Sequence, residues 1–228
     1  MPRPARYNHH VASLRTFFLE GKAGRLEALL NEGDPAAKYS GLICHPHPAG
    51  GGTMHNKVVY HAMKTLHGLG FPVLRFNFRG VGASEGEHDK GQGEQDDVRT
   101  ALDWLTREFQ RPILFVGFSF GSAVGMRACC PDSRVPGLVA LGLPTGHDTR
   151  RYEYPWLATC AKPKLFVSGG RDEYGPKESV EAIVNATAGE NELVWIDGAD
   201  HFFQSDAGPK LNEMQAALRA WLVRHHFA

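Results

Sequence analysis

The chain has 228 residues, 42% of them hydrophobic and 22% charged, which is ordinary for a folded protein and enough for one sizeable α/β domain. Lysine plus arginine and aspartate plus glutamate each number 25, and there is no basic stripe, so we expect no nucleic-acid partner. Apolar runs fall far short of the roughly 20 residues of a membrane helix, and residues 1–10 lack a signal-peptide core, so we expect a cytoplasmic protein that binds no membrane.

The four cysteines give no motif. Cys129 and Cys130 are adjacent, whereas Cys44 and Cys160 stand apart, and neither a zinc site nor a redox pair has this spacing. Buried reduced thiols fit a cytoplasmic protein better than disulfides do. We therefore expect no disulfide bond, no metal ion and no cofactor.

Hydrophobic patterning predicts an α/β fold. Residues 14–20 and 25–31 flank a loop with glycine at both ends and predict an antiparallel hairpin, although residues 25–31 also suit a helix. Further strands are expected at residues 41–44, 72–78, 112–116, 138–141, 164–168 and 192–196, and helices at 57–69, 94–109, 122–128, from about 176, and around 211–222. This alternation predicts one domain over residues 1–228, a mostly parallel twisted sheet with helices on both faces and the hairpin at one edge.

The segment Gly117-Phe118-Ser119-Phe120-Gly121 links an apolar strand to a helix rich in small residues. The glycines allow two backbone segments to approach closely, which is what a sharp turn with an exposed serine requires. The turn also places Ser119 at a helix N-terminus, where N–H groups favour negative charge. This context predicts that Ser119 is a catalytic nucleophile rather than part of a structural turn.

A serine nucleophile needs a histidine base and an acid that orients the histidine. His201 follows the strand predicted at residues 192–196 and is the best candidate for the base, and Asp172 follows the strand before it. Asp197 and Asp200 are the competing acids, but they share a loop with His201 and suit turn and capping roles. We therefore expect a Ser119–Asp172–His201 triad, in the chain order of serine, acid and histidine.

The negative charge on a tetrahedral intermediate needs backbone N–H donors. One is expected from Phe120, which follows the nucleophile, and the second from the loop after residues 41–44. In that loop His47 lies between Pro46 and Pro48, which have no N–H, so we assign the second donor to His47, with Ala49 or a glycine as the alternative. A zinc site at His45 and His47 is not expected, because no third ligand is evident.

Together these motifs resemble the α/β-hydrolase superfamily, and within it the small lidless bacterial serine hydrolases with a His-Pro-His-Pro loop. The resemblance runs from about residue 17 to the end, and it is carried by His45-Pro46-His47-Pro48 with Gly51-Gly52-Thr53-Met54, by residues 75–82, by Gly117-Phe118-Ser119-Phe120-Gly121, by Ser168-Gly169-Gly170-Arg171-Asp172 and by residues 198–203. It implies the same triad that the spacing predicts. Many superfamily members have His-Gly where this chain has His45-Pro46.

The connection formed by residues 143–163 is too short for a large helical cap. Residues 150–160 can still form one helix over the site, with Trp156 reaching into it. Phe118, Phe120, Phe202 and Phe203 are candidates for the acyl pocket, although a core position suits Phe118 and Phe203 better. For the substrate pocket we single out Phe118, Phe202 and Trp156.

These features predict a serine hydrolase that cleaves small carboxylic esters, with short acyl groups favoured by an open site, through an acyl-enzyme intermediate. A peptidase or a thioesterase that uses the same triad is the main alternative. A non-catalytic binding protein is a third possibility, against which the intact triad argues. We expect a monomer or a homodimer.

Overall fold

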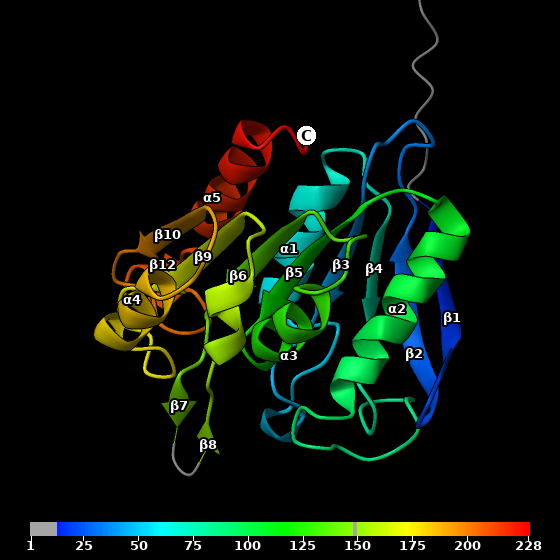
Figure 1. Cartoon of the computed structure of the whole chain (residues 1–228), viewed down its shortest axis with the longest axis horizontal. Helices are drawn as coiled ribbons and strands as arrows, with labels where there is room; N and C mark the ends of the chain where they lie inside the picture. Colours follow the sequence, from blue (N-terminus) through cyan, green and yellow to red (C-terminus); the bar gives the residue numbers. More distant parts are fainter. Residues whose placement is uncertain (1–12, 148–149) are drawn as a thin grey trace, which may run out of the picture.

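The computed structural model describes residues 13–147 and 150–228. The main sheet contains β1 (Leu14–Gly21), β2 (Gly24–Asn31), β3 (Ser40–Cys44), β4 (Val73–Phe76), β5 (Ile113–Phe118), β6 (Gly137–Leu141), β9 (Lys164–Gly169) and β10 (Asn191–Ile196). Its eight strands lie in the order β1-β2-β4-β3-β5-β6-β9-β10 (Figure 1). The β1–β2 and β2–β4 pairs are antiparallel and all the others are parallel, which confirms the predicted mostly parallel sheet with an N-terminal hairpin.

Helices cover both faces of the sheet (Figure 1). They are α1 (Lys57–His67), α2 (Glu94–Phe109), α3 (Phe120–Cys129), α4 (Lys177–Asn185) and α5 (Leu211–Arg224). Helices α1 and α5 lie on one face, and α2, α3 and α4 on the other. The helical alternative for residues 25–31 is wrong, because this segment pairs with a strand on each side and tertiary pairing outweighs helix propensity.

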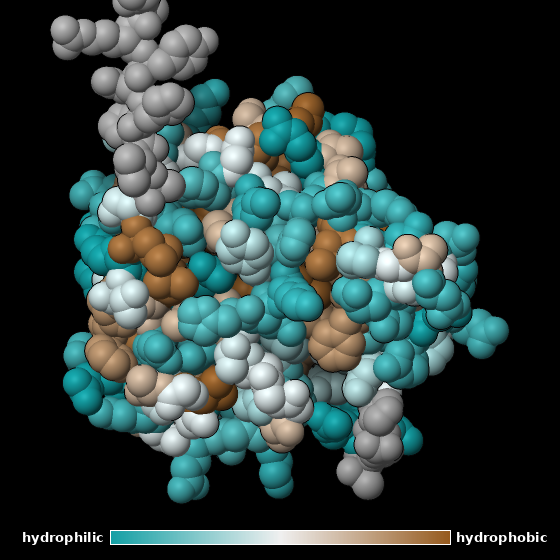
Figure 2. All heavy atoms as spheres, turned by 180° about the vertical axis from the view of Figure 1, so that it is seen from behind, coloured by the Kyte–Doolittle hydropathy of each residue, from teal (hydrophilic) through white to brown (hydrophobic). Residues whose placement is uncertain are grey.

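The hydrophobic core is split by the sheet into two layers, and β5 contributes to both. Ile113 and Phe115 face α2 and α3, whereas Val116 and Phe118 face α1 and α5, as expected from the two-residue period of a strand. Figure 2 shows the α1 and α5 side of the molecule, where hydrophobic side chains form separate small patches among hydrophilic ones.

The register of the parallel strands brings their carboxyl ends to one level. Cys44 is paired with Gly117, Phe118 with Leu141, and Ile196 with Gly169. The residues that follow β3, β5, β6, β9 and β10 therefore lie along one edge of the sheet, the lower edge in Figure 1. This is the edge at which ligands bind in open α/β sheets.

The connection between β6 and β9 is not the predicted helix. It contains the two-stranded hairpin of β7 (Gly146–His147) and β8 (Arg150–Arg151), followed by the short 3-10 helix η2 (Pro155–Thr159). Pro155 explains the difference, because a proline lacks an N–H and fits only the first turn of a helix, so η2 begins there. No lid-like insertion is found in the described residues. The remaining elements are the 3-10 helix η1 (Pro48–Gly50) and a second small hairpin of β11 (Gln204–Ser205) and β12 (Gly208–Pro209).

The prediction of reduced cysteines is wrong for one pair. Cys130 at the end of α3 and Cys160 after η2 form a disulfide bond, whereas Cys44 and Cys129 are free and buried. The bonded residues are 30 positions apart, so the pairing depends on tertiary structure and not on a sequence motif. Over the part of the chain that the structure describes, none of the helices could span a membrane. The cytoplasmic location stays a prediction.

Candidate active site

Ser119 lies in the sharp turn between β5 and α3, with backbone angles of φ 53° and ψ −124° that residues other than glycine rarely adopt. Gly117 makes the turn possible, because a Cβ atom at this position would lie 2.4 Å from the Cα atom of Ser122. The Ser119 N–H donates to the carbonyl of Leu141 at 2.9 Å and ties the turn to the next strand. The serine is therefore held at the N-terminus of α3 by its backbone.

A chain of hydrogen bonds joins Ser119, His201 and Asp172. His201 Nε2 lies 2.8 Å from Ser119 Oγ, and His201 Nδ1 lies 2.9 Å from each carboxylate oxygen of Asp172. A carboxylate only accepts, so this pattern assigns the proton to Nδ1 and leaves Nε2 to accept from the serine hydroxyl. Asp172 Oδ1 also accepts from the N–H groups of Tyr174 and Gly175, which fix the carboxylate. The structure thus brings together the three residues that the sequence singled out.

The imidazole of His201 is held in place by aromatic rings. The ring centroids of Tyr174 and Phe118 lie 4.4 and 5.1 Å from that of His201, and Phe202 stands edge-on to it at 5.2 Å. Gly142 provides the remaining space, since a Cβ atom there would lie 3.2 Å from two atoms of the imidazole. These contacts leave the histidine little freedom to turn away from the serine.

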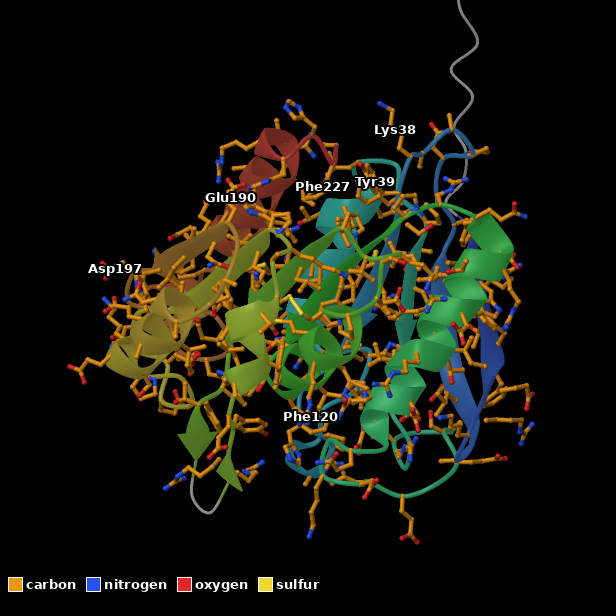
Figure 3. All side chains as sticks on the ribbon, viewed as in Figure 1. Lys38, Tyr39, Phe120, Glu190, Asp197 and Phe227 are labelled. Carbon is orange, nitrogen blue, oxygen red and sulfur yellow. A yellow bond between two sulfur atoms is a disulfide. The ribbon has the colours of Figure 1, made fainter. Side chains whose placement is uncertain are left out.

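Asp197 and Asp200, the alternative candidates for the acid, form no hydrogen bond or ion pair with the His201 imidazole in the described residues. Asp200 Oδ1 accepts the N–H groups of Phe202 and Gln204, both at 2.8 Å, and so shapes the loop that contains His201. Asp197 is exposed, and Figure 3 places it at the left side of the molecule, away from Phe120 at the lower edge. Within residues 13–147 and 150–228, the carboxylate that reaches the His201 ring is that of Asp172.

His45, which follows β3, is fully buried. Its Nδ1–H donates to the carbonyl of Pro46 at 2.7 Å, and its Nε2 accepts the N–H of Phe78 at 3.0 Å. Burial lowers the pKa of His45 to about 4, with the hydrogen bond to Pro46 acting in the opposite direction, so the ring is neutral at pH 7. His45 thus links the loop after β3 to the chain after β4, and neither ring nitrogen is left to bind a metal ion.

Among the candidate oxyanion donors in the loop after β3, one backbone N–H has no acceptor in the described residues. Ala49 N–H donates to His47 Nδ1 at 3.1 Å, and the N–H groups of Gly50, Gly51 and Gly52 donate to carbonyls of the same loop. The N–H of His47 donates to no atom of the described residues. The alternative donors are therefore engaged, and the His47 N–H is the one that remains.

The N–H of Phe120 is also without a protein acceptor in the part of the chain that the structure describes, as expected for the first residue of a helix. The loop that contains His47 packs against it. The His47 and Phe120 ring centroids are 4.8 Å apart, and a Cβ atom at Gly121 would lie 2.5 Å from the carbonyl oxygen of His45. Two unpaired N–H groups therefore lie on adjoining segments beside Ser119.

Ser119 opens into a pocket of about 110 Å³, which we call the serine pocket. Its walls include His47, Asn56, Ser119, Tyr174, His201 and Phe202, and Arg150, Pro46 and residues 50–52 complete it. Among the residues expected to line a substrate pocket, Phe202 is there. Phe118 is not, because its side chain is fully buried behind His201 in the layer that faces α1 and α5.

Trp156 lies outside the serine pocket. It lines a second cavity of about 200 Å³, which we call the neighbouring cavity, together with Phe120, Val124, Arg127, Arg151 and Tyr154. Trp156 belongs to η2, whose start at Pro155 turns this part of the chain toward α3. The expected role of Trp156 depended on a helix that does not form.

Sequence reasoning missed three residues of the serine pocket. Tyr174 follows the predicted acid by two positions, so its place after a strand was a usable signal. Asn56 caps α1, with its Oδ1 accepting the N–H of Val58 at 2.9 Å, and a polar residue before a helical stripe was a second such signal. No pattern in the sequence indicates that Arg150 lines the pocket, because it reaches the pocket through a hairpin of two-residue strands.

The topology of the sheet and the position of Ser119 between β5 and α3 define an α/β-hydrolase fold. The chain belongs to the alpha/beta hydrolase domain family, whose model matches residues 40–223. It is 34% identical over 213 residues to an uncharacterized protein of Rickettsia prowazekii, covering 90% of this chain and 87% of that protein.

Two solved structures extend the comparison. An alpha-beta serine hydrolase homologue from Coxiella burnetii is 36% identical, with a TM-score of 0.81 over 91% of this chain and 97% of that one. A serine hydrolase without lid from Xanthomonas campestris is 31% identical, with a TM-score of 0.79 over 93% and 94% of the two chains. The chain is therefore an α/β hydrolase of the lidless serine hydrolase type.

Proposed function

We propose that the protein hydrolyses small carboxylic esters through an acyl-enzyme intermediate formed on Ser119. The observation that carries the proposal is the hydrogen-bonded chain of Ser119, His201 and Asp172, which ends at the wall of a pocket. In the first half of the reaction Ser119 Oγ attacks the ester carbonyl while His201 Nε2 takes its proton. His201 then protonates the leaving alcohol, and Asp172 stabilises the imidazolium without being protonated itself.

The oxyanion of each tetrahedral intermediate is bound by the N–H groups of Phe120 and His47. Both donors are unpaired within the described residues, which supports this role, and each contributes about 3 kcal/mol to transition-state binding if it acts as oxyanion donors do elsewhere. Water, activated by His201, then cleaves the acyl-enzyme by the same steps in reverse order. The second half returns Ser119 to its starting state.

The size of the serine pocket favours a short acyl group. At about 110 Å³ it is well below the roughly 300–1,000 Å³ of sites that enclose drug-sized ligands. Phe202 supplies an apolar wall with 43% of its surface exposed, so a short alkyl chain gains some burial there. Longer chains would extend into solvent and gain little.

The test is hydrolysis of p-nitrophenyl esters from acetyl to dodecanoyl, with acyl-coenzyme A thioesters and aminoacyl anilides in parallel. We expect the highest kcat/KM for short oxygen esters and complete loss of turnover in Ser119→Ala with an unchanged circular dichroism spectrum. Ser168→Ala is the matched control, because it removes a buried serine hydroxyl that has no partner in the described residues and lies outside the pocket. A preference for thioesters or anilides would replace the ester proposal with the corresponding alternative.

A further inference from the structure

Among the described residues that line it, the serine pocket has one positively charged side chain and no negatively charged one. None of the described residues that line it is an aspartate or a glutamate, and the carboxylate of Asp172 is buried behind His201. Arg150 is the one lysine or arginine among these lining residues. The charged side chain that the described residues contribute to the wall of this pocket is therefore a cation.

Arg150 reaches the pocket because of the hairpin that replaces the expected helix. Successive side chains of a strand point to opposite sides, and in β8 the side chain of Arg150 lines the serine pocket while that of Arg151 lines the neighbouring cavity. Figure 1 shows the hairpin at the lower edge of the sheet, the edge at which α3 begins. Arg150 is half-buried, so its guanidinium is partly desolvated but accessible to a ligand.

The guanidinium of Arg150 forms no ion pair or hydrogen bond with any described residue. Arg134, which is of intermediate burial like Arg150, and the more deeply buried Arg79 are both paired. Arg79 forms a bidentate pair with Asp97, and Arg134 binds Asp132 in the same way. A guanidinium without a protein partner can bind a ligand that supplies one, and its position at the wall of the pocket points to such a ligand.

Two further features agree with a negatively charged ligand. Asn56, the N-cap of α1, lines the same pocket, so the positive end of that helix dipole faces it. Arg150 and His47 line the same pocket, and burial, followed by the positive charge of Arg150 and then that of His88, lowers the pKa of His47 to about 4. Arginine binds carboxylate and phosphate groups through two parallel hydrogen bonds.

We propose that the substrates of this enzyme are esters that carry an anionic group, a carboxylate or a phosphate, and that Arg150 binds this group while Ser119 attacks the ester carbonyl. The inference rests on the proposed function and adds the chemical class of the substrate. It makes Arg150 a specificity residue, which recognises a part of the substrate that does not react.

The first experiment compares two p-nitrophenyl esters of the same length. One is the half-ester of glutaric acid, and the other has the free carboxylate replaced by a neutral carboxamide. Two further pairs of acetate esters place a carboxylate or a phosphate on the alcohol side, each compared with the carboxamide as reference, and so identify the kind and side of the charge. Spontaneous hydrolysis is subtracted for each ester. We expect kcat/KM to be at least about tenfold higher for one of the anionic esters, as for a hydrogen bond to a charged group.

Variants assign the effect to Arg150. In Arg150→Gln the ratio of anionic to neutral kcat/KM should fall to about one, mainly through a loss of kcat/KM for the anionic ester, and Arg150→Lys should keep part of the preference. Arg127→Gln removes an arginine that lines the neighbouring cavity and should leave the ratio unchanged. An equal kcat/KM for charged and neutral esters in the wild type, or a preference that survives in Arg150→Gln, would overturn the inference.

The outcomes separate this inference from the proposed function. Hydrolysis of the neutral esters tests the function alone, and it can succeed when the charge preference is absent. If no ester is hydrolysed, calorimetric titration of Ser119→Ala with the same pairs still tests the inference. Tighter binding of an anionic ester that is lost in Ser119→Ala combined with Arg150→Gln supports it, and equal binding of both members of each pair contradicts it.

Discussion

The serine pocket and the neighbouring cavity share strand β8 as a wall, but they differ in what else surrounds them. The neighbouring cavity is the larger, about 200 Å³ against about 110 Å³, and it is lined by side chains of α3, the loop at residues 90–92 and the connection at residues 151–156. The serine pocket is lined by residues that follow β3, β5, β9 and β10, at the edge of the sheet where the carboxyl ends of these strands lie. In this fold, position relative to the strand ends, and not cavity size, distinguishes the pocket in which Ser119 lies.

The charges of the two cavities also differ. The neighbouring cavity mixes Lys90, Arg127 and Arg151 with Glu153, whereas the lining of the serine pocket contains Arg150 and no carboxylate among the described residues. Where side chains of both signs line a cavity, they can pair with one another or be hydrated. The single arginine of the serine pocket has no such partner in the described residues.

The largest expected effect is that of Asp172→Asn. The amide would keep an oxygen for the N–H groups of Tyr174 and Gly175 and turn its NH₂ group toward His201 Nδ1, which forces the proton onto Nε2. Nε2 then cannot accept the serine proton, and we expect kcat to fall by about 10,000-fold. Stopped-flow ester hydrolysis measures this fall, and Asp197→Asn, at an exposed site, is the control that should retain wild-type kcat. A loss of less than tenfold in Asp172→Asn would remove Asp172 from the mechanism.

The next effect concerns His45 and stability at acid pH. Its pKa is lowered from 6.5 to about 4 in the folded protein, so between these values the unfolded chain binds a proton that the folded chain does not. The contribution of neutral His45 to the free energy of unfolding is therefore fully present above pH 6.5. It is lost as the pH falls toward 4, by about 3 kcal/mol in all.

His45→Gln tests this prediction because glutamine can still accept the Phe78 N–H but does not titrate. Urea unfolding at a series of pH values gives the free energy of unfolding for both proteins. The difference between the two curves above pH 6.5 measures how much the packing and hydrogen bonds of the neutral imidazole stabilise the wild type. Below pH 6.5 the wild type should lose about 3 kcal/mol more than the variant, and parallel curves down to pH 4 would show that His45 is not the group responsible.

The smallest effects compare one aromatic residue from each cavity. Phe202→Ala enlarges the serine pocket, so we expect a severalfold rise of KM for butyryl esters and a shift of the preferred acyl chain toward longer groups. Trp156→Ala changes only the neighbouring cavity and should leave kcat/KM within about twofold for every chain length. Steady-state kinetics over the ester series measures both, and a larger effect of Trp156→Ala would mean that the acyl group occupies the neighbouring cavity.

The parts of this structure that the sequence predicts well are those fixed by periodicity and local geometry. Helix α2 has the predicted bounds, because its apolar residues recur over sixteen positions. The meeting of Ser119, Asp172 and His201 follows from the rule that residues after parallel strands gather at one edge. The N–H groups of Ala49 and the loop glycines are engaged in hydrogen bonds, which leaves the N–H of His47 without an acceptor in the described residues. These hydrogen bonds depend on the folded shape of the loop and cannot be predicted from the sequence.

The parts that the sequence does not predict depend on tertiary contacts over short segments. Strands of two residues, as in β7 and β8, have no period to detect, so the place of Arg150 could not be foreseen. Phe118 is one of the residues singled out for the pocket, although a core position suits it better, and it lies in the core because both faces of β5 are covered. The pairing of Cys130 with Cys160 depends on how η2 packs near the end of α3.

Trapping the covalent intermediate tests directly whether Ser119 is the nucleophile. The protein is mixed with p-nitrophenyl acetate, quenched in acid within the first turnovers, digested and examined by mass spectrometry. We expect one acetyl group on Ser119, in an amount that matches the burst of p-nitrophenol, and none on that peptide in Ser119→Ala. Stoichiometric acetylation of another residue that accounts for the burst, or hydrolysis with no covalent adduct at any quench time, would contradict this expectation.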